Sequence, residues 1–202
     1  MKKYTLVLLW ILLQTHLMAA TVVNTTYTQA SLTLDYESIN TEDTVWAALT
    51  LNHKDGWHSY WKNPGDSGLP TKLTWTVPNN IQPLQALWDL PELFYLGPIV
   101  NYGYYKKAQI LTPLKVNKID QATSEIKLYA EWLVCEEACI PESANFEIIL
   151  NHNSSNIFSQ SKQDIHELRH YLLTIPMYKT TYKLTNDEFH LNMPTDLNLK
   201  EI

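Results

Sequence analysis

Several segments of the chain alternate apolar and polar residues with a period of two, the spacing that places one face of a β-strand in a core. In the longest run, residues 125–134, the apolar side chains on one side belong to Ile126, Leu128, Ala130, Trp132 and Val134. The same alternation recurs in residues 31–38, 45–51, 72–77 and 145–150. Turn-forming clusters separate these segments at residues 52–56, 63–68 and 77–80. Many short strands separated by turns predict an all-β fold, an immunoglobulin-like β-sandwich at about residues 21–151.

The pattern changes after residue 151. Residues 151–161 are polar and rich in Ser and Asn, which is typical of a linker. Three apolar residues then recur at helical spacing and predict a short amphipathic helix over 162–173, namely Ile165, Leu168 and Leu172. Residues 182–185 and 188–193 are expected to form a hairpin about Asn186 and Asp187. Because a lone hairpin is only marginally stable in water, we interpret this part as the start of a second β domain.

Residues 1–20 have the pattern of an export signal. Lys2 and Lys3 precede the apolar run 4–13, and small residues follow at Ala19 and Ala20. Since the apolar run is too short to span a bilayer comfortably, we interpret it as a cleaved signal peptide and not as a membrane tether. The predicted division of the chain is a signal peptide (1–20), the sandwich (21–151), a linker with a short helix (152–176) and an incomplete second β domain (177–202).

Composition supports a folded domain and argues against nucleic-acid binding. Apolar residues make up 45% of the 202 residues and charged residues 18%, which is enough apolar side chain for a packed core. The 7 Trp and 12 Tyr, against 5 Gly, favour β-sheet. The formal net charge is −6 and becomes −8 without Lys2 and Lys3. Such a surface would repel a phosphate backbone.

The segment NPGDSGLP at 63–70 contains a tetrapeptide similar to the one around the nucleophilic serine of trypsin-like proteases, Gly65-Asp66-Ser67-Gly68. That chemistry needs a histidine to take the serine proton and a carboxylate to orient the histidine. In trypsin-like proteases both partners precede the serine on a scaffold of two barrels, and too few residues precede Ser67 for even one barrel. We therefore interpret the segment as a structured turn, in which glycines adopt positive φ and polar side chains bond backbone amides.

The two cysteines, Cys135 and Cys139, lie in WLVCEEACIP at 132–141. In an extended strand, residues four apart are separated by about 13 Å, whereas a disulfide needs Cα atoms closer than about 7 Å. If the two bond, residues 136–138 must bend back sharply. The strand would then end at Val134 or Cys135, with the pair near solvent at the end of the sheet.

Three roles are open to this pair: a redox-active disulfide, a structural staple or two metal ligands. Closing so short a ring removes little chain entropy, about 2 kcal/mol, and short rings are common in reversible exchange. Two thiolates need further ligands to hold a metal, and nothing in the sequence places His53, His58 or Met177 beside them. The pattern favours the redox pair, and we expect no metal and no cofactor.

Acidic residues flank the pair at positions 131, 136, 137 and 142. Nearby carboxylates disfavour a thiolate and should raise the pKa of both thiols. We hypothesise that Glu136 and Glu137 modulate the pair in this way, so that it reacts only when a docked partner alters its surroundings. The alternative is that these glutamates simply form a solvated surface.

Three blocks together resemble the N-terminal periplasmic domain of the DsbD family of thiol:disulfide interchange proteins, especially its ScsB-like branch. They are GWHSYWKNPGDSGLP at 56–70, GPIVNYGYY at 97–105 and WLVCEEACIP at 132–141. The likeness covers roughly residues 28–151, and the helix and hairpin that follow also fit that branch. It is the combination that is specific, since no single block would be.

The resemblance implies an immunoglobulin-like domain in the periplasm that takes electrons from a membrane-embedded thiol reductase domain. The domain would pass them to periplasmic client proteins, either disulfide-containing or thioredoxin-like. By position, Cys135 and Cys139 match the family's catalytic redox pair, which implies a component of a protein-disulfide reductase. Family members shield that pair with a cap loop, whose counterpart here is the loop with Asn101, Tyr102 and Tyr104. Which cysteine is attacked first does not follow from the resemblance.

Full-length members of the family continue into membrane helices and a thioredoxin-like domain. We therefore expect this sequence to be either a fragment of a longer membrane protein or a stand-alone carrier. Its cysteine spacing is shorter than in the best-known DsbD branch, so the choice of clients is not transferred. Two other functions stay open, a cell-envelope interaction module with a structural disulfide and a copper-handling protein, since thiols bind Cu(I) well.

Overall fold

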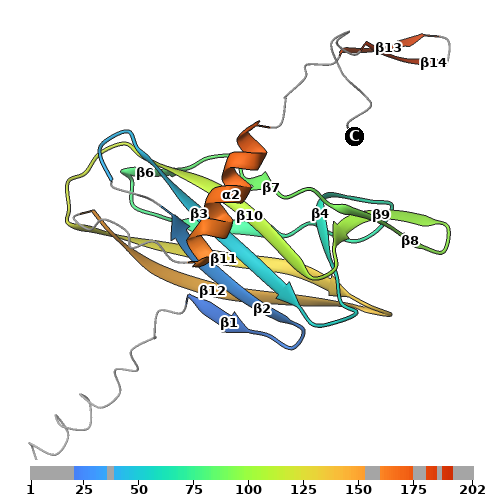
Figure 1. Ribbon diagram of the computed structural model, residues 1–202, viewed down its shortest axis with the longest axis horizontal. Coiled ribbons are helices and arrows are strands. Elements are labelled where there is room, and N and C mark those ends of the chain that lie inside the picture. The colour runs from blue at the N-terminus through green and yellow to red at the C-terminus, as the bar shows by residue number, and fades with distance from the viewer. Residues whose placement is uncertain (1–20, 36–38, 153–159, 175–180, 186–187, 193–202) are drawn as a thin grey trace, which may run out of the picture.

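The computed structural model describes residues 21–35, 39–152, 160–174, 181–185 and 188–192. These residues form a β-sandwich with one helix, α2, lying across it (Figure 1). The all-β fold class predicted from the alternating pattern is therefore confirmed. The predicted signal peptide 1–20 and the hairpin turn at Asn186 and Asp187 lie outside the described residues.

The larger sheet has the strand order β1–β2–β3–β10–β6, and β7 also pairs with β10. Its strands are β1 (Val22–Asn24), β2 (Thr28–Asp35), β3 (Thr44–His53), β6 (Ile81–Pro83), β7 (Leu87–Trp88) and β10 (Lys107–Val116). The strand predicted at 31–38 begins earlier, at Thr28, because β2 pairs with β3 from Thr28 onward. Residues 36–38, the end of that prediction, lie outside the described residues.

The second sheet has the order β12–β11–β5 and consists of β5 (Lys72–Thr76), β11 (Thr123–Cys135) and β12 (Cys139–Asn151). The strands predicted at 72–77 and 125–134 are confirmed. The strand predicted at 145–150 begins earlier, at Cys139, because β12 pairs with β11 in unbroken register up to Cys135. The β11–β12 hairpin therefore ends at the two cysteines.

The core lies between these two sheets and is built from the alternating residues. The five β11 residues predicted to share one side are each at most 3% exposed: Ile126, Leu128, Ala130, Trp132 and Val134. They pack in one cluster with residues of the larger sheet, among them Leu32, Leu49 and Leu51. Removal of this apolar surface from water supplies the main driving force for folding.

A third, small sheet lies at one end of the sandwich (Figure 1, right). Its order is β4 (Ser59–Gly65), β9 (Ile99–Tyr104) and β8 (Glu92–Leu96). A backbone bridge just before β4, between His58 and Cys135, joins this sheet to the end of β11. The small sheet is therefore anchored directly at the cysteine pair.

The structured turn predicted at 63–70 is present but shorter, over residues 66–69, because 63–65 complete β4 and Pro70 pairs with Tyr60. Gly65 and Gly68 have φ values of 90° and 83°, a region that L side chains disfavour. The Asp66 N–H donates to the Val100 carbonyl at 2.9 Å, and its Oδ2 accepts from the Val100 N–H at 2.8 Å. The N–H and hydroxyl of Ser67 both donate to Asn101 Oδ1 at 3.0 Å. These bonds hold the turn, including Ser67, against β9.

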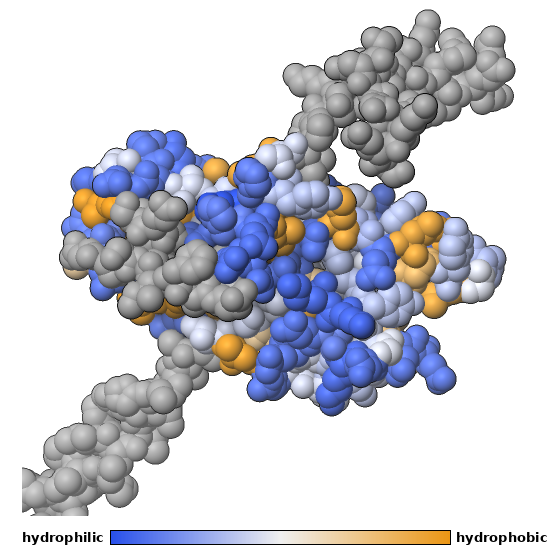
Figure 2. All heavy atoms as spheres, in the orientation of Figure 1, coloured by the Kyte–Doolittle hydropathy of each residue, from blue (hydrophilic) through white to orange (hydrophobic). Residues whose placement is uncertain are grey.

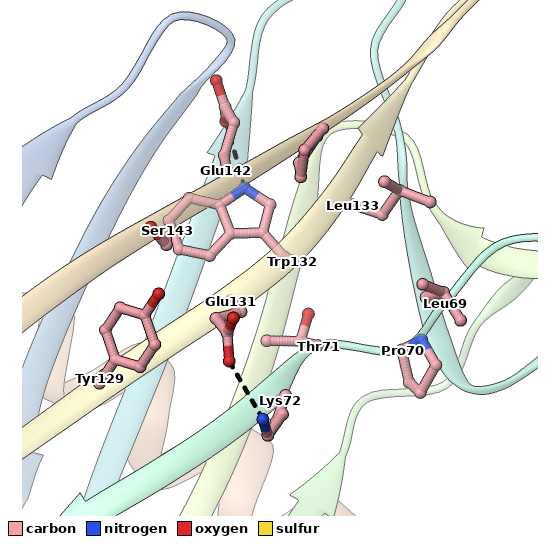
Figure 3. A pocket seen from close by; sticks show the side chains of 11 residues that line it. Leu69, Pro70, Thr71, Lys72, Tyr129, Glu131, Trp132, Leu133, Glu142 and Ser143 are labelled. Atoms are coloured by element: carbon pink, nitrogen blue, oxygen red, sulfur yellow. Dashed lines mark hydrogen bonds and ion pairs between the residues drawn. The ribbon is translucent and has the colours of Figure 1, made fainter.

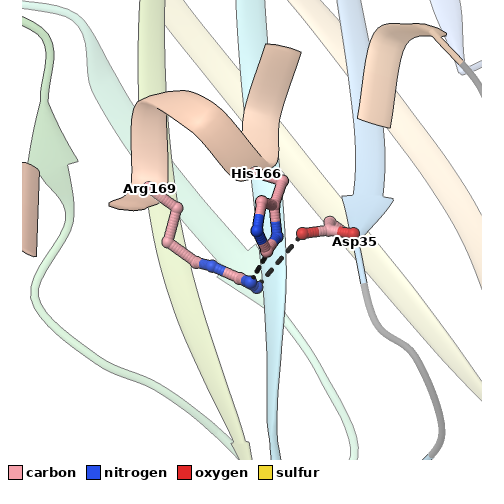
Figure 4. Close-up of polar contacts among 3 residues, drawn as sticks. All are labelled: Asp35, His166 and Arg169. Carbon is pink, nitrogen blue, oxygen red and sulfur yellow. Dashed lines mark hydrogen bonds and ion pairs between the residues drawn. The ribbon is translucent and has the colours of Figure 1, made fainter. Parts of the chain in front are cut away.

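Helix α2 (Gln160–Thr174) contains the helix predicted at 162–173 and lies on the outer face of the larger sheet. Ile165 is buried against Ala48 and Leu111, and Leu168 and Leu172 are half-buried in the same cluster. An ion pair adds to this interface between α2 and β2, where Arg169 Nη1 lies 3.1 Å from Asp35 Oδ2 (Figure 4). Arg169 also lies 2.8 Å from His166 Nδ1.

The predicted hairpin after the helix is present, as β13 (Thr181–Thr185) and β14 (Glu188–Asn192). It lies away from the sandwich in Figure 1. Our interpretation of residues 177–202 as the start of a second domain stays a prediction, as do the other domain boundaries. Within the described residues, no helix combines the length and the apolar character needed to span a bilayer.

Candidate redox site

The two cysteines form a disulfide at the end of the β11–β12 hairpin. Cys135 is the last residue of β11, Cys139 is the first residue of β12, and the two lie directly opposite each other. Their Cα atoms are 4.1 Å apart and the S–S distance is 2.04 Å. A turn over 136–138 makes this approach possible, closed by a 3.3 Å bond from the Glu136 N–H to the Ala138 carbonyl. The predicted strand end and sharp bend are confirmed.

The two sulfur-bearing residues have very different exposure. Cys135 is only 1% exposed, whereas Cys139 is exposed to solvent together with the turn that precedes it. Sequence reasoning found no feature that distinguishes them, because it could not see which cysteine the small sheet would cover. An incoming nucleophile can therefore reach Cys139 much more readily than Cys135.

Aromatic side chains of the small sheet cover Cys135. Tyr60 of β4 and Phe94 of β8 form one buried cluster with Cys135, and Tyr105 and Leu133 are packed against it. The Tyr60 hydroxyl reaches further and lies 3.9 Å from Cys139 Sγ. Burial of this hydroxyl raises the pKa of Tyr60, because a phenolate would lose its hydration there. The cover thus keeps water from the inner sulfur and places a neutral hydroxyl beside the outer one.

His58, which directly precedes β4, pairs with Cys135 through its backbone. Its N–H donates to the Cys135 carbonyl at 3.0 Å, and the Cys135 N–H donates to the His58 carbonyl at 2.9 Å. The imidazole is 2% exposed and lies edge-on to Phe94, with the ring centres 4.7 Å apart. Desolvation lowers the pKa of His58 from its ordinary value, so the ring is neutral at neutral pH.

The three residues predicted to form the cap lie on β9. Asn101 is buried and accepts the bonds from Ser67. Tyr104 is buried in the main core, where its hydroxyl donates to the Asp89 carbonyl at 2.7 Å and burial raises its pKa. Tyr102 is half-buried, with its ring 6.4 Å from that of Trp61.

The aromatic ring that the β8–β9 hairpin packs in the Cys135 cluster is Phe94. Sequence reasoning missed this residue and concentrated on the strand that follows it. Asn101 and Tyr104 hold the hairpin in place through their hydrogen bonds, and whether the β9 residues themselves shield the disulfide stays a prediction. Leu93, Phe94 and Tyr95 are all apolar or aromatic, so the sequence holds no alternation that could have identified Phe94, although only Phe94 of the three is buried.

Two of the four flanking carboxylates have structural partners instead of lying at the sulfur atoms. Glu131 pairs with Lys72 at 3.3 Å. Glu142 is 8% exposed and points to the other side, where it accepts bonds from the Tyr27 N–H at 2.8 Å and the Thr25 hydroxyl at 2.7 Å. Glu142 is therefore not part of a solvated surface. Only the turn residues Glu136 and Glu137 stay exposed beside the disulfide, and their effect on the thiols stays a prediction.

A hollow of about 580 Å³ lies on the β11–β12–β5 sheet (Figure 3). Leu133 and Pro141, which line it, pair directly across the two strands, two positions from the cysteines and on the same sheet face. Leu69 and Pro70 from the 63–70 turn line another part. The hollow is thus a recess that a polypeptide could occupy while its own cysteine faces Cys139.

Apolar surface also gathers over the β8–β9 end of the molecule (Figure 2). The exposed large apolar residues of this hairpin are Leu93, Tyr95, Leu96 and Ile99. Such a patch on an exposed hairpin is typical of a protein-binding surface. Elsewhere, no three His, Cys, Asp or Glu side chains lie close enough to hold a metal ion within the residues that the structure describes.

Comparison with known families matches residues 27–151 to the model for the N-terminal domain of the thiol:disulfide interchange protein DsbD. This chain belongs to the DsbD N-terminal domain family. The match includes every strand of the sandwich except β1, the small sheet and both cysteines, and it agrees with the resemblance found from three sequence blocks. A family named for thiol–disulfide interchange and a disulfide at the exposed end of a hairpin together support thiol–disulfide exchange as the chemistry of this DsbD N-terminal domain.

One of the similar solved structures supports this fold. The N-terminal periplasmic domain of ScsB from Proteus mirabilis aligns with a TM-score of 0.59 at 17% identity, covering 85% of this chain and 67% of that one. The reduced N-terminal domain of DsbD from Neisseria meningitidis aligns with a TM-score of 0.41 at 17% identity, covering 62% and 86% of the two chains. The search of curated proteins found no match. At such identities the ScsB likeness establishes the fold alone.

Proposed function

We propose that this DsbD N-terminal domain is an electron carrier that works by thiol–disulfide exchange at Cys135 and Cys139. The observation that carries the proposal is the asymmetry of the disulfide, in which Cys139 is exposed and Cys135 is buried under Tyr60 and Phe94. A structural staple needs no accessible sulfur, and so short a ring stabilises the fold little, by about 2 kcal/mol. One open and one covered sulfur instead suit a disulfide that reacts in a defined order.

The exchange begins at Cys139. A thiolate of a reduced donor attacks Cys139 Sγ along the S–S axis, the Cys135–Cys139 bond breaks, and Cys135 leaves as a thiolate that takes up one proton. The second donor thiol then attacks the donor sulfur of the mixed disulfide and releases Cys139. Two electrons and two protons have moved to the domain. The same steps in reverse, with Cys139 attacking a client disulfide, return the domain to its oxidised form.

The partners we propose are a membrane-embedded thiol reductase domain as donor and disulfide-containing or thioredoxin-like proteins as clients, in the periplasm. The related domain of Proteus mirabilis ScsB is periplasmic, and residues 1–20 carry the sequence pattern of an export signal. The apolar β8–β9 hairpin contributes Phe94 to the Cys135 cluster, and the hollow is lined by Leu133 and Pro141, which lie two positions from the cysteines. Both would be covered by a partner whose sulfur contacts Cys139.

Two further features would restrain the pair between encounters. We propose that the exposed carboxylates of Glu136 and Glu137 disfavour the thiolate of Cys139 when no partner is bound. The hairpin that carries Asn101, Tyr102 and Tyr104 would hold Phe94 over Cys135, so that the inner sulfur meets only Cys139. Both features protect the reduced form from unselective oxidation.

The order of attack is tested by trapping with single-cysteine variants. Cys135→Ser leaves the exposed thiol and Cys139→Ser leaves the buried one; each is mixed with oxidised glutathione, and mixed disulfides are measured by intact-protein mass spectrometry. We expect Cys135→Ser to form the adduct at least ten times faster. Equal rates, or faster reaction of Cys139→Ser, would contradict attack at Cys139, provided circular dichroism shows that both variants are folded.

A further inference from the structure

His58 is a buried polar side chain that the folded, oxidised domain leaves unsatisfied. Both of its ring nitrogens are inaccessible to solvent and have no hydrogen-bond partner among the described residues. Burying an imidazole without a partner is unfavourable, and a group of this kind in a native structure calls for an explanation such as a redox or catalytic role. The nearby His53, in contrast, has partners on both nitrogens, Thr28 at 3.2 Å and Ser59 at 2.8 Å.

The position of His58 relates it directly to the inner sulfur. His58 and Cys135 exchange both backbone hydrogen bonds, and residues paired in this way carry their side chains on the same face, with Cβ atoms about 5.5 Å apart. The imidazole contacts the Tyr60 and Phe94 rings, with ring centres 5.3 Å and 4.7 Å away, and these two rings form the buried cluster with Cys135. Imidazole and sulfur therefore share one enclosed, largely apolar space.

Reduction changes what this space must hold. In the disulfide, Cys135 Sγ has no proton and is a weak acceptor. When the bond to Cys139 breaks, Cys135 becomes a thiolate, and a thiolate buried in apolar surroundings is destabilised and has a raised pKa. The Tyr60 hydroxyl lies toward Cys139. The buried Cys135 thiolate needs a hydrogen-bond or proton donor, and the ring nitrogens of His58 have no other partner among the described residues. His58 is therefore the group that can supply one.

We propose that His58 is the proton partner of Cys135, an inference that rests on the proposed function. In the oxidative half-reaction a His58 ring nitrogen accepts the Cys135 Sγ–H proton. The resulting thiolate attacks Cys139 Sγ of the mixed disulfide, the Cys135–Cys139 bond forms, and the client sulfur leaves with the electron pair. The imidazolium then releases its proton to solvent, so that His58 is neutral again in the oxidised domain. In the reductive half-reaction the departing Cys135 thiolate favours uptake of one proton from solvent at the His58 ring, and His58 passes this proton to Cys135 Sγ. A Cys–His pair of this kind activates the thiol in other sulfur chemistry.

The titratable groups around His58 are few. Tyr60 and Tyr105 face its ring from β4 and from the segment between β9 and β10. Burial lowers the pKa of His53, on β3, to about 4, so this ring is neutral at pH 7 and offers His58 no countercharge. The Glu136 carboxylate lies against Gly56, two residues before His58 in the chain. Among the residues that the structure describes, only the thiolate of Cys135 offers a countercharge within the enclosed space, so protonation of His58 and ionisation of Cys135 are expected to be coupled.

The first test measures the Cys135 titration without any partner, in the reduced Cys139→Ser protein, from the pH dependence of the Cys135 Cβ NMR shift. His58→Phe keeps an aromatic ring in the cluster but removes both nitrogens, and we expect it to raise the pKa of Cys135 by at least one unit, a ten-fold loss of thiolate at pH 7. Tyr105→Phe, which removes a neighbouring hydroxyl from the same cluster, is the control and should leave the titration unchanged. Equal titrations with and without His58, or an equal effect of Tyr105→Phe, would overturn the inference.

The second test follows the rate at which the reduced, two-cysteine domain is reoxidised by oxidised glutathione as a function of pH. His58→Phe should be about ten-fold slower at pH 7 and should approach the wild-type rate above the raised thiol pKa. Identical pH profiles with normal wild-type exchange would overturn the role of His58 alone. No exchange in the wild type would instead overturn the proposed function.

Should His58→Phe fail to fold, the wild-type domain itself provides the measurement. The nitrogen NMR shifts of the His58 ring should differ between the oxidised and the reduced forms, because only the reduced form offers a hydrogen-bond partner. Its titration in the reduced form should coincide with that of Cys135. Ring nitrogens with the same shifts in both redox forms would overturn the inference.

Discussion

Gly68 lies directly against the ring of Tyr60. A Cβ atom at position 68 would collide with three carbons of that ring, and φ at Gly68 is +83°. The hydroxyl of the same ring lies 3.9 Å from Cys139 Sγ. The NPGDSGLP segment, which is similar to a protease motif, therefore has a packing role at the redox site. The absence of a side chain at Gly68 lets the Tyr60 ring pack against the turn, with its hydroxyl near Cys139.

Gly68→Ala is expected to destabilise the domain by about 2–4 kcal/mol, because both the backbone conformation and the ring contact are lost. Gly97→Ala is the matched control, since Gly97 also has a positive φ, of 63°, but has open space around its Cα. Urea unfolding of both variants separates the two terms. The Gly97 variant should lose only the backbone part, about 1 kcal/mol. Equal losses in the two variants would show that the Tyr60 contact contributes nothing.

Glu142→Ala should cost about 2–4 kcal/mol of unfolding free energy. The buried carboxylate accepts hydrogen bonds from Tyr27, Thr25 and Trp132, and the alanine leaves these donors without it. Glu137→Ala is the control, because Glu137 is an exposed acidic residue close by in sequence and should change stability by less than about 0.5 kcal/mol. Urea unfolding at pH 7 gives both values. A Glu142 variant as stable as the control would contradict the buried role.

His53 should make the stability of the domain depend on pH. Burial lowers the pKa of His53 from 6.5 to about 4, and the Glu142 carboxylate only partly opposes this. Between these values the unfolded chain binds a proton that the folded domain does not. The unfolding free energy should therefore fall as the pH drops through this window, by about 3 kcal/mol at most.

The His53 effect is measured as a difference between variants. Wild type should lose about 2–3 kcal/mol more than His53→Gln between pH 7 and pH 4, as determined by urea unfolding at each pH. His170→Gln, at an exposed histidine of α2, should follow the wild-type curve. If the unfolding free energies of wild type and His53→Gln changed equally with pH, the pKa of His53 would not be lowered in the folded domain.

Helix α2 should dock on the sandwich through Ile165. Ile165 is 2% exposed, whereas Leu173 on the same helix is 59% exposed. Ile165→Ala should weaken docking by about 2–3 kcal/mol, seen as faster hydrogen exchange of the α2 amides with little change in the β11 amides. Leu173→Ala should leave both unchanged. Equal protection of α2 in the two variants would contradict docking through Ile165.

Much of the fold could be predicted because alternation along a strand reports directly which face is buried. The five apolar positions of 125–134 are core residues, and the spacing of Ile165, Leu168 and Leu172 is the docked face of α2. The bend at the cysteines could be predicted from distance alone. In an extended strand, two cysteines with three residues between them lie too far apart to form a disulfide. These inferences needed only local geometry.

The missing parts of the site depend on contacts between distant segments. Phe94 belongs to a hairpin that is apolar at most positions, so that no pattern shows which ring will meet a sulfur contributed by β11. The exposure of Cys139 and the burial of Cys135 likewise depend on where the small sheet lies. The buried role of Glu142 could have been predicted from the sequence. Glu142 lies on the same strand face as Ala144 and Phe146, which are buried, and a carboxylate on a core face requires hydrogen-bond donors.

The equilibrium potential of the Cys135–Cys139 pair tests the central claim most directly. The domain would be equilibrated in glutathione buffers of known ratio, quenched with acid, alkylated and counted by mass spectrometry as oxidised or reduced. A working carrier should have a potential within the range of exchange proteins, about −120 to −270 mV. A potential below about −300 mV, the range of structural disulfides, would contradict the account.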